Sequence, residues 1–556
     1  MSRFFYSTLL LLTGILLGLS VAAFFRAGDY EYDITKEMIA HTESLLGLKF
    51  SDSQRDSMLT NVQGNLSSYE VMRDYELDNS VPPALHYSPL STGYQPDPAK
   101  GNTEWQIPDE IDLPENADEL AWYSIPELAS LIQQGKITSE ELTRFFLDRL
   151  KQYDSELKAV ITYTEERALD QARKADREIA EGNYKGPLHG IPYGAKDLFA
   201  VEGYLTTWGA EPYKDQERDE TATAIRNLDD AGAILIAKLS TGALAWGDVW
   251  FGGKTRTPWN TEIGASGSSA GPAAAAAAAL VPFALGTETL GSIVSPSTRN
   301  GVTGLRPTYG RVSRHGVMAL SWSMDKAGPI ARSVEETAIV FDAIHGKDDH
   351  DYTSHDFPFY FDYRENLEGV TIGYHKEGFE TDYDSRRQDS LVINQLEDMG
   401  AELVPFSMPE VPTSSISFIL QAEAAAAFDE LTRSGRDTMM VRQVQNAWPN
   451  VFRASRLIPA VEYIQANRIR TDLLHEMNRI ADDFDLFVTP AFAGGNLLTT
   501  NLTGHPSISV PNGINEDGIP VSITFTGNLF DEGELMSVIS AWQRQSDYEQ
   551  LRPEGF

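Results

Sequence analysis

The 556-residue sequence contains no cysteine. This absence excludes disulfides, thiolate metal sites and a thiol nucleophile together. Basic residues are also scarce, since 45 Lys and Arg stand against 81 Asp and Glu and give a formal net charge of −36. Nucleic-acid binding depends on cations that neutralise phosphates, so we expect no nucleic-acid partner. A Gly-x-x-x-x-Gly-Lys-Ser/Thr phosphate loop is absent as well, and we expect neither a metal nor an organic cofactor.

Long hydrophobic runs are rare, and a single one stands at the N-terminus. Phe4 to Phe25 are 22 uncharged positions between Arg3 and Arg26. As a helix this run would rise about 33 Å, enough to cross a bilayer, and it is longer than the apolar part of a signal peptide. We therefore expect residues 1–28 to be an uncleaved anchor that leaves the catalytic domain outside the cytoplasm. Cleavage near Ala22-Ala23, which would release a secreted protein, stays open.

Residues 29–117 differ in pattern from the rest of the chain. Apolar residues at helical spacing on both sides of Gly47 and Ser51 predict a helical hairpin. Residues 79–117 are rich in proline and show no periodicity, which favours a linker or a segment that wraps the surface.

From residue 118 onward, short apolar runs alternate with helical patterns. Runs of this length, closed by polar residues, Gly or Pro, are typical of buried strands. Their alternation with helices predicts an α/β fold with a mixed sheet surrounded by helices. The runs are Ala233–Lys238, Val370–Tyr374, Leu403–Phe406, Leu486–Val488, Ser507–Val510 and Val521–Phe525.

A stretch rich in serine and glycine, residues 264–296, carries the chemistry. Ser268 and Ser269 precede a predicted helix, Pro272–Leu280, whose alanines favour that structure. Ser292 directly follows Gly291, so both ends of the stretch present a serine hydroxyl beside glycine. Serine- and glycine-rich segments are more often plain loops. Here the buried-looking alanine run and the second Gly-Ser element favour a catalytic arrangement.

One lysine stands in an unusual setting. Lys196 lies in the apolar, glycine-punctuated segment 186–199, next to Asp197. A surface position at a turn is the ordinary interpretation of such a lysine. The alternative is a buried lysine, whose lowered pKa would make it a base.

Four motifs that occur in order resemble the amidase signature family, and the resemblance extends from about Trp122 to the C-terminus. It implies that residues 118–556 form one α/β catalytic domain. It also implies an amidase, a hydrolase that acts on carbon–nitrogen bonds other than peptide bonds, in linear amides. The motifs are Gly190-Ile-Pro-Tyr-Gly-Ala-Lys-Asp, Ser266-Gly-Ser-Ser-Ala-Gly, Gly286-Thr-Glu-Thr-Leu-Gly-Ser-Ile and Gly301-Val-Thr-Gly-Leu-Arg-Pro-Thr-Tyr-Gly.

The resemblance implies a Ser–cis-Ser–Lys triad that works through an acyl-enzyme intermediate. By motif, Ser292 is the nucleophile, Ser268 the bridging serine in a cis peptide and Lys196 the base. A serine hydroxyl needs such a base at neutral pH. Ser269 lies outside this relay, so its replacement should be mild. Backbone N–H groups are expected to hold the oxyanion, those of Thr289, Leu290, Gly291 and Ser292.

Four positions depart from the family pattern, and two of them, Ala270 and Pro272, replace a glycine and a small or acidic residue. Leu290 replaces a glycine in the oxyanion loop, and Val294 replaces an arginine near the nucleophile. None of the four belongs to the triad. They leave the identity of the substrate open, rather than the chemistry.

Several functions compete. The favoured one is a membrane-anchored amidase for a small-molecule amide, whose apolar N-terminus is similar to that of fatty acid amide hydrolase. The alternative is the glutamine amidase component of a tRNA-dependent amidotransferase. A third is an α/β-hydrolase esterase, because Gly267-Ser-Ser-Ala-Gly matches Gly-x-Ser-x-Gly, with His505 as its histidine. A poor strand before the serine speaks against it. The oligomeric state stays open.

Overall fold

A computed structural model describes residues 34–74, 77–546 and 548–556. They fall into two compact units, divided between Val81 and Pro82. The expected N-terminal anchor lies outside the described residues. Within the described ranges, no helix has the length and apolar character needed to span a bilayer.

In its described residues, the first unit contains two helices, α2 (Lys36–Leu46) and α3 (Asp52–Arg73). Helix α2 ends at Gly47, whose φ of 65° lies in the left-handed region that glycine adopts without a steric penalty. Ser51 then caps α3: its hydroxyl accepts a hydrogen bond from the backbone N–H of Gln54, and the Ser51 N–H donates to the Gln54 side chain. The two turn residues therefore define where both helices stop and start.

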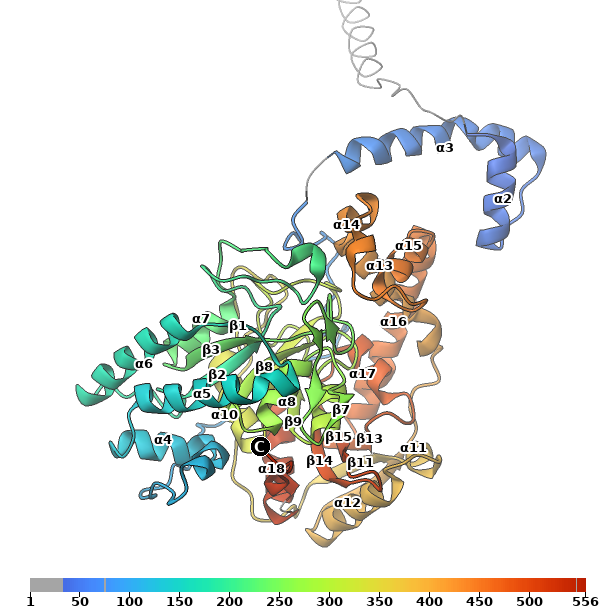
Figure 1. The fold of residues 1–556 in the computed structure, drawn as a ribbon. Helices are drawn as coiled ribbons and strands as arrows, with labels where there is room; N and C mark the ends of the chain where they lie inside the picture. The colour runs from blue at the N-terminus through green and yellow to red at the C-terminus, as the bar shows by residue number, and fades with distance from the viewer. Residues whose placement is uncertain (1–33, 75–76, 547) are drawn as a thin grey trace, which may run out of the picture. The chain divides into compact units, whose positions relative to one another are not determined.

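The second unit is built on an 11-stranded mixed sheet, as far as the described residues show it (Figure 1). The strand order is β1-β3-β2-β8-β10-β9-β14-β15-β13-β11-β12. Strands β3, β2 and β8 are parallel to one another, as are β13, β11 and β12, and the strands between these groups are antiparallel. The bounds are β1 Val160–Tyr163, β2 Pro192–Lys196, β3 Ile234–Leu239, β8 Phe283–Glu288, β9 Thr303–Arg306, β10 Lys326–Ala331, β11 Thr371–His375, β12 Glu402–Phe406, β13 Leu486–Pro490, β14 Ser507–Ile514 and β15 Pro520–Gly527.

The prediction of a mixed α/β sheet is confirmed. All six apolar runs form strands, namely β3, β11, β12, β13, β14 and β15. The sequence pattern does not predict the middle strands β2, β8, β9 and β10, because glycine and proline interrupt their apolar runs. Their buried position explains this composition: Gly194 in β2, for example, lies against the side chain of Leu239 where a Cβ would collide. Close packing between strands thus removes the signal that bulky residues give elsewhere.

Two short hairpins stand outside the large sheet, β4 (Val249–Trp250) with β5 (Gly253–Lys254) and β6 (Arg256–Thr257) with β7 (Asn260–Gly264). Helices surround the sheet (Figure 1). Their bounds are α4 Ile125–Gln133, α5 Ser139–Leu157, α6 Glu165–Ala180, α7 Thr223–Asp230, α8 Ala270–Ala277, α9 Val294–Asn300, α10 Val334–Ile344, α11 Lys376–Glu380, α12 Arg386–Asp398, α13 Phe418–Ala427, α14 Asp429–Arg433, α15 Trp448–Ser455, α16 Ala460–Ala481, α17 Asn496–Thr503 and α18 Glu532–Ser546.

Helix α8 is the alanine run that the sequence predicts, shifted two residues toward the N-terminus. Every residue of it is buried. Its small side chains let the helix lie directly against β8 and β10 in the centre of the unit. Ser269 occupies the position just before its first turn, so the serine loop is carried by a fully buried helix.

The proline-rich segment of the second unit runs along its surface. Tyr87 donates a hydrogen bond from its hydroxyl to the carbonyl of Leu502 over 3.0 Å, and the Ala99 N–H donates to Asp531 over 3.0 Å. Farther along, the carbonyl of Pro108 accepts a hydrogen bond from Ser130. Between the two alternatives for this segment, linker or surface wrap, these contacts favour the wrap.

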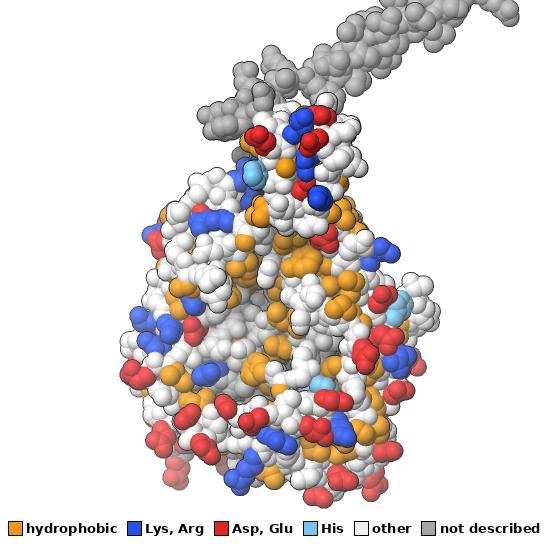
Figure 2. Space-filling view, turned by 90° about the vertical axis from the view of Figure 1, so that its right-hand side faces the viewer, with side chains coloured by type: hydrophobic (Ala, Val, Ile, Leu, Met, Phe, Trp, Pro, Cys, Tyr) orange, Lys and Arg blue, Asp and Glu red, His pale blue; other side chains and the backbone are white. Residues whose placement is uncertain are grey.

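The surface reflects the acidic composition. On the face shown in Figure 2, Asp and Glu side chains crowd the lower part, with Lys and Arg interspersed and apolar side chains exposed between them. Such a surface repels anions at long range, and the absence of a nucleic-acid partner stays a prediction.

Candidate active site

Lys196 stands at the carboxyl end of β2, between the parallel neighbours β3 and β8. Its side chain is fully buried. Its Nζ donates to Ser268 Oγ over 2.8 Å, to Ser269 Oγ over 3.1 Å and to Thr287 Oγ1 over 2.7 Å. Of the two interpretations of this lysine, surface residue or buried base, the burial excludes the first.

Burial lowers the pKa of Lys196 well below its usual value, and the carboxylates of Asp325 and Glu288 offset this effect only in part. The partners of Nζ are neutral hydroxyl groups and a carbonyl, none of which pairs with an ammonium ion as a carboxylate would. The site thus favours a neutral amine, which has a lone pair to accept a proton.

Ser268 and Ser269 meet Lys196 from the loop before α8. The peptide bond between Gly267 and Ser268 is cis, and both serine side chains are buried. Gly267 is required here because a Cβ at this position would collide with the carbonyl of Gly247. The Ser269 hydroxyl also donates to the Thr287 carbonyl over 3.1 Å and accepts from the Thr287 N–H over 3.2 Å. Ser269 therefore belongs to the hydrogen-bond network around Lys196, and its position outside the proton relay stays a prediction.

Ser292 lies in the loop between β8 and α9. Its side chain is 7% exposed, and its hydroxyl has no hydrogen-bond partner among the described residues. The Ser292 carbonyl accepts a hydrogen bond from the Ser269 N–H over 3.1 Å, which ties the two serine loops together. Gly291 before it has φ of 79°, a conformation that glycine adopts readily. The free hydroxyl is open to a substrate carbonyl.

Four backbone N–H groups of this loop have no acceptor within the described part of the protein, those of Thr289, Leu290, Gly291 and Ser292. The loop is held from one side by Thr289, whose hydroxyl donates to Asp325 over 2.5 Å. N–H groups left unpaired beside a serine hydroxyl are able to donate to an oxyanion. The structure thus brings the four expected positions onto one short turn.

Glu288 fixes the start of α9 behind the loop. Its carboxylate accepts hydrogen bonds from the N–H groups of Ile293 and Val294 over 2.8 and 3.0 Å. It also pairs with Arg306 over 3.0 Å and accepts from the Asn501 amide over 2.7 Å. Burial alone would raise the pKa of Glu288, but the nearby cations and these donors lower it to about 2. A permanent carboxylate therefore anchors the segment that carries Ser292.

Asp197, next to the lysine in sequence, serves another partner. Its carboxylate forms a buried ion pair with Lys238 over 2.7 Å and accepts from the Thr207 N–H over 2.8 Å. It therefore leaves Lys196 without a paired carboxylate.

Comparisons with known proteins identify the family of the chain. Residues 141–498 match the family model described as "Amidase". A curated component of the glutamyl-tRNA(Gln) amidotransferase from Halorhodospira halophila is 34% identical over 484 residues, which cover 78% of this chain and 99% of the relative. Among solved structures, an amidase family protein from Bacillus anthracis gives a TM-score of 0.70 at 27% identity, covering 79% of this chain and 93% of that one. The peptide amidase from Stenotrophomonas maltophilia gives 0.68 at 28% identity, covering 78% and 98%.

The chain belongs to the amidase signature family. It is a hydrolase that acts on carbon–nitrogen bonds. The family resemblance that the motifs indicate is therefore confirmed, while the similarity of the N-terminus to that of fatty acid amide hydrolase stays a prediction.

Two departures from the amidase signature pattern have different surroundings. Leu290 is 37% exposed, so its side chain lies at the opening of the site and does not fill a buried pocket. Val294 is fully buried at the first position of α9. The first changes the surface that a substrate meets, and the second removes a charge from the interior.

His505, the histidine of the esterase alternative, does not serve a serine. It is fully buried, and its Nδ1 lies 2.9 Å from Thr503 Oγ1. Burial and the charge of Arg306 lower its pKa to about 3. In this amidase signature site the hydroxyl of Ser269 faces Lys196 and Thr287 instead. The esterase alternative loses its base.

Some residues of the site are absent from the sequence prediction. Thr287 and the Glu288–Arg306 pair stand in quoted motifs, so a search for buried polar residues there would have indicated them. Asn501 lies in α17, more than 200 positions from Glu288 in sequence, and no local pattern marks it.

Proposed function

We propose that this amidase signature enzyme hydrolyses a carboxylic acid amide through a covalent acyl-enzyme on Ser292. The observation that supports it is the contact between buried Lys196 and Ser268, whose side-chain atoms Nζ and Oγ lie 2.8 Å apart. Burial lowers the pKa of Lys196 and so favours its neutral form. The loop that carries Ser268 is hydrogen-bonded to the backbone of Ser292 through the Ser269 N–H. Lys196 takes the proton of Ser268 while Ser268 takes that of Ser292, and Ser292 Oγ attacks the amide carbon. The carbonyl oxygen becomes an oxyanion held by the free N–H groups of residues 289–292.

The second half of the cycle restores the enzyme. The relay returns the proton to the departing amine, the C–N bond breaks, and the acyl group stays on Ser292. Water then attacks the acyl carbon and gives a proton to the relay. The relay returns this proton to Ser292 Oγ as the bond between Oγ and the acyl carbon breaks, and the carboxylic acid leaves. Each proton goes through Ser268 and Lys196, so the lysine is neutral again before the next substrate binds.

A serine-directed sulfonyl fluoride tests these roles. The reagent should label Ser292, and Ser292→Ala should lose labelling and turnover together. Ser268→Ala and Lys196→Met should lower kcat by about 10² to 10⁴, since a positioned proton-transfer partner is removed. His505→Asn serves as the control and should keep most of the activity. Peptide mapping that places the label on Ser269 would overturn the assignment.

For the substrate, the names of the curated relatives favour the glutamine amidase of a tRNA-dependent amidotransferase over a stand-alone amidase. Those relatives are named as one subunit of a larger enzyme, which implies that they work with companion subunits. The structural relatives include a peptide amidase, whose name supports a stand-alone amide hydrolase. Val294 in place of the family arginine is the feature of this site that sets it apart from the common pattern.

Ammonia release separates the two assignments. The full-length chain alone is assayed on L-glutamine and on propionamide, and again after co-expression with the companion proteins of its own source. Glutamine turnover that rises with the companions, with little turnover of propionamide, supports the amidotransferase assignment. Efficient turnover of propionamide by the chain alone, unchanged by companions, supports the stand-alone amidase.

A further inference from the structure

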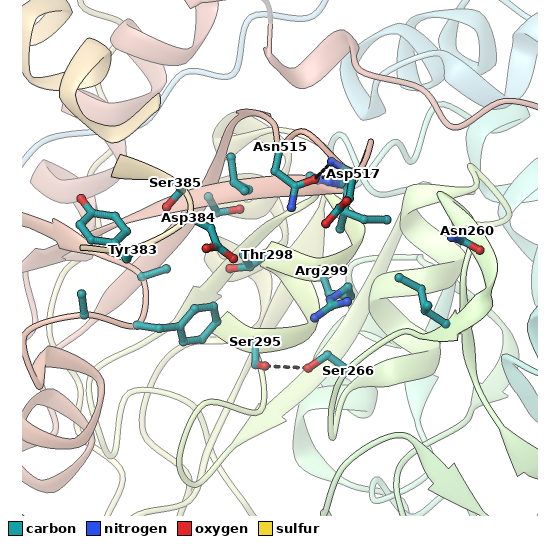
Figure 3. Close-up of a pocket in the computed structure, with 18 residues that line it drawn as sticks. Asn260, Ser266, Ser295, Thr298, Arg299, Tyr383, Asp384, Ser385, Asn515 and Asp517 are labelled. Atoms are coloured by element: carbon teal, nitrogen blue, oxygen red, sulfur yellow. Dashed lines mark hydrogen bonds between the residues drawn. The ribbon is translucent and has the colours of Figure 1, made fainter. Parts of the chain in front are cut away.

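A cavity of about 850 Å³ adjoins the catalytic loops without including the nucleophile. Ser266 and Ser295 line it, and their hydroxyl oxygens lie 2.7 Å apart (Figure 3). Ser266 stands two positions before Ser268, and Ser295 three positions after Ser292. The volume of the cavity is in the range of small-molecule binding sites.

Three charged side chains enter this cavity from three segments. Arg299 comes from α9, Asp384 from the segment before α12, and Asp517 from the turn between β14 and β15 (Figure 3). None of the three side chains forms a hydrogen bond or ion pair with a described residue. Charged side chains directed at a shared cavity, and not at one another, are available to a ligand.

The rest of the lining is mixed in a way that limits the ligand. Hydroxyl groups of Thr298 and Ser385 stand near the charges. Apolar side chains add a second kind of surface, and among them Phe492 is 58% exposed although it lines the cavity. An exposed aromatic ring offers contact area to an apolar group at low entropic cost. A ligand that matches the whole lining carries both charges and an apolar part.

We propose that this cavity binds a free α-amino acid with an aromatic or large apolar side chain. Its carboxylate pairs with the planar guanidinium of Arg299, which suits bidentate recognition. Its ammonium group lies between the carboxylates of Asp384 and Asp517. Its side chain packs on Phe492. A phosphate or other multiply charged anion fits less well, because two carboxylates face a single cation.

This site is separate from the one that performs the amide hydrolysis. Ser292, Ser268 and Lys196 are absent from its lining. The ligand therefore binds whether or not Ser292 carries an acyl group.

Calorimetric titration of the full-length protein tests the proposal with three matched probes: L-phenylalanine, N-acetyl-L-phenylalanine, which lacks the ammonium, and phenethylamine, which lacks the carboxylate. L-Phenylalanine should bind about 10-fold more tightly than either analogue, since each lost ion pair weakens binding by at least that factor. Treatment with a serine-directed sulfonyl fluoride should leave this affinity unchanged.

Substitutions assign the contacts. Arg299→Gln should weaken L-phenylalanine and N-acetyl-L-phenylalanine by about 10-fold and leave phenethylamine unchanged. The double variant Asp384→Asn with Asp517→Asn should weaken L-phenylalanine and phenethylamine and leave the acetylated probe unchanged. Arg387→Gln, an exposed arginine of α12 outside the lining, is the matched control and should change nothing.

Equal binding of the three probes, unchanged L-phenylalanine affinity in Arg299→Gln, or loss of binding after sulfonyl fluoride treatment would overturn the proposal. So would the absence of any heat signal from L-phenylalanine up to about 10 mM, which corresponds to a negligible binding free energy. Turnover of an amide by untreated enzyme is measured separately, so failure here leaves the proposed catalytic function standing.

Discussion

Ser269 is the residue at which structure and motif differ most. The motif places it beside the relay, whereas its hydroxyl contacts Lys196 Nζ and both backbone groups of Thr287. It thus orients the amine toward Ser268. We predict that Ser269→Ala lowers kcat by about 10- to 100-fold, less than loss of Ser268, with KM nearly unchanged.

Steady-state kinetics on a small amide checks this prediction, with Ser390→Ala as the control. Ser390 is an exposed serine of α12 whose hydroxyl bonds only to a carbonyl of its own helix. Wild-type kcat in Ser269→Ala would show that Thr287 and Ser268 orient Lys196 without it.

The three catalytic candidates show what sequence reasoning reaches at this scale. Lys196, Ser268 and Ser292 are reached through the motifs that resemble the amidase signature family, because residue type alone leaves a surface lysine and plain serine loops as the ordinary interpretations. The partners of these residues are not marked. Thr287 acts through its backbone and hydroxyl, and such a contact leaves no pattern in the sequence.

At the scale of elements, α9 depends on a buried ion pair. Glu288 bonds to the first N–H groups of the helix and pairs with Arg306, and both side chains are fully buried. We predict that Glu288→Gln lowers the free energy of unfolding by about 3 to 5 kcal/mol, since it leaves the Arg306 charge buried without a partner. It should also lower kcat, because Ser292 stands directly before this turn.

Urea unfolding of the wild type and of Glu288→Gln measures the difference in the free energy of unfolding. Lys214→Gln is the control, because it breaks a surface ion pair in which the side chains of Lys214 and Glu211 are 46% and 31% exposed. Its loss should lower the free energy of unfolding by less than about 1 kcal/mol. A Glu288→Gln protein within about 1 kcal/mol of wild type would mean that the hydroxyls of Thr500 and Ser507 and the His505 carbonyl satisfy Arg306.

Helix α12 and strand β14 are joined by a carboxyl group that titrates near neutral pH. Asp389 is buried, and it accepts hydrogen bonds from Asn512 over 2.6 Å and from Ser385 over 3.3 Å. Burial raises its pKa to about 7, and the hydrogen bonds offset only part of this effect. The folded protein therefore keeps a proton that the unfolded chain releases near pH 4.

The number of protons bound at Asp389 in the folded and unfolded states decides how stability changes with pH. Between about pH 4 and 7 the folded state holds more protons at Asp389 than the unfolded state, so stability falls as pH rises, by about 4 kcal/mol over the whole range. In Asp389→Asn this contribution is absent and the Asn512 donor keeps its acceptor. We predict that the melting temperature of the wild type falls relative to Asp389→Asn as pH rises from about 4 to 7. Parallel curves in differential scanning calorimetry would contradict it.

The elements also show why part of the fold escapes the sequence. Strands β11 to β15 have branched and aromatic residues, and their bounds follow from apolar runs. Strands β8 and β10 contain glycine and proline where they pair, Gly286 with Gly328 and Leu285 with Pro329. Small residues allow α8 to approach, so the centre of the sheet is composed of residues that ordinarily end strands.

At the scale of the whole molecule, catalysis and location belong to separate parts of the chain. Every residue of the active site lies in the unit Pro82–Phe556, whereas the 22-residue apolar run lies at the N-terminus. We propose that this run anchors the protein in a membrane with the catalytic unit outside the cytoplasm, a location that fits the stand-alone amidase and speaks against the tRNA-dependent amidotransferase. Its length and lack of charge favour this role.

Fractionation of cells that express the full-length chain tests the anchor. The intact protein should remain in the membrane pellet after a carbonate wash, which removes peripheral proteins but not a membrane-spanning helix. A chain that begins at Gly28 should stay in the supernatant and hydrolyse a small amide with the same kcat/KM, because Lys196, Ser268 and Ser292 are unaffected. Mass spectrometry of the pellet distinguishes an uncleaved anchor from a processed signal. Full-length, unprocessed protein in the supernatant would contradict the proposal, since 22 uncharged apolar residues would then have found another partner than lipid.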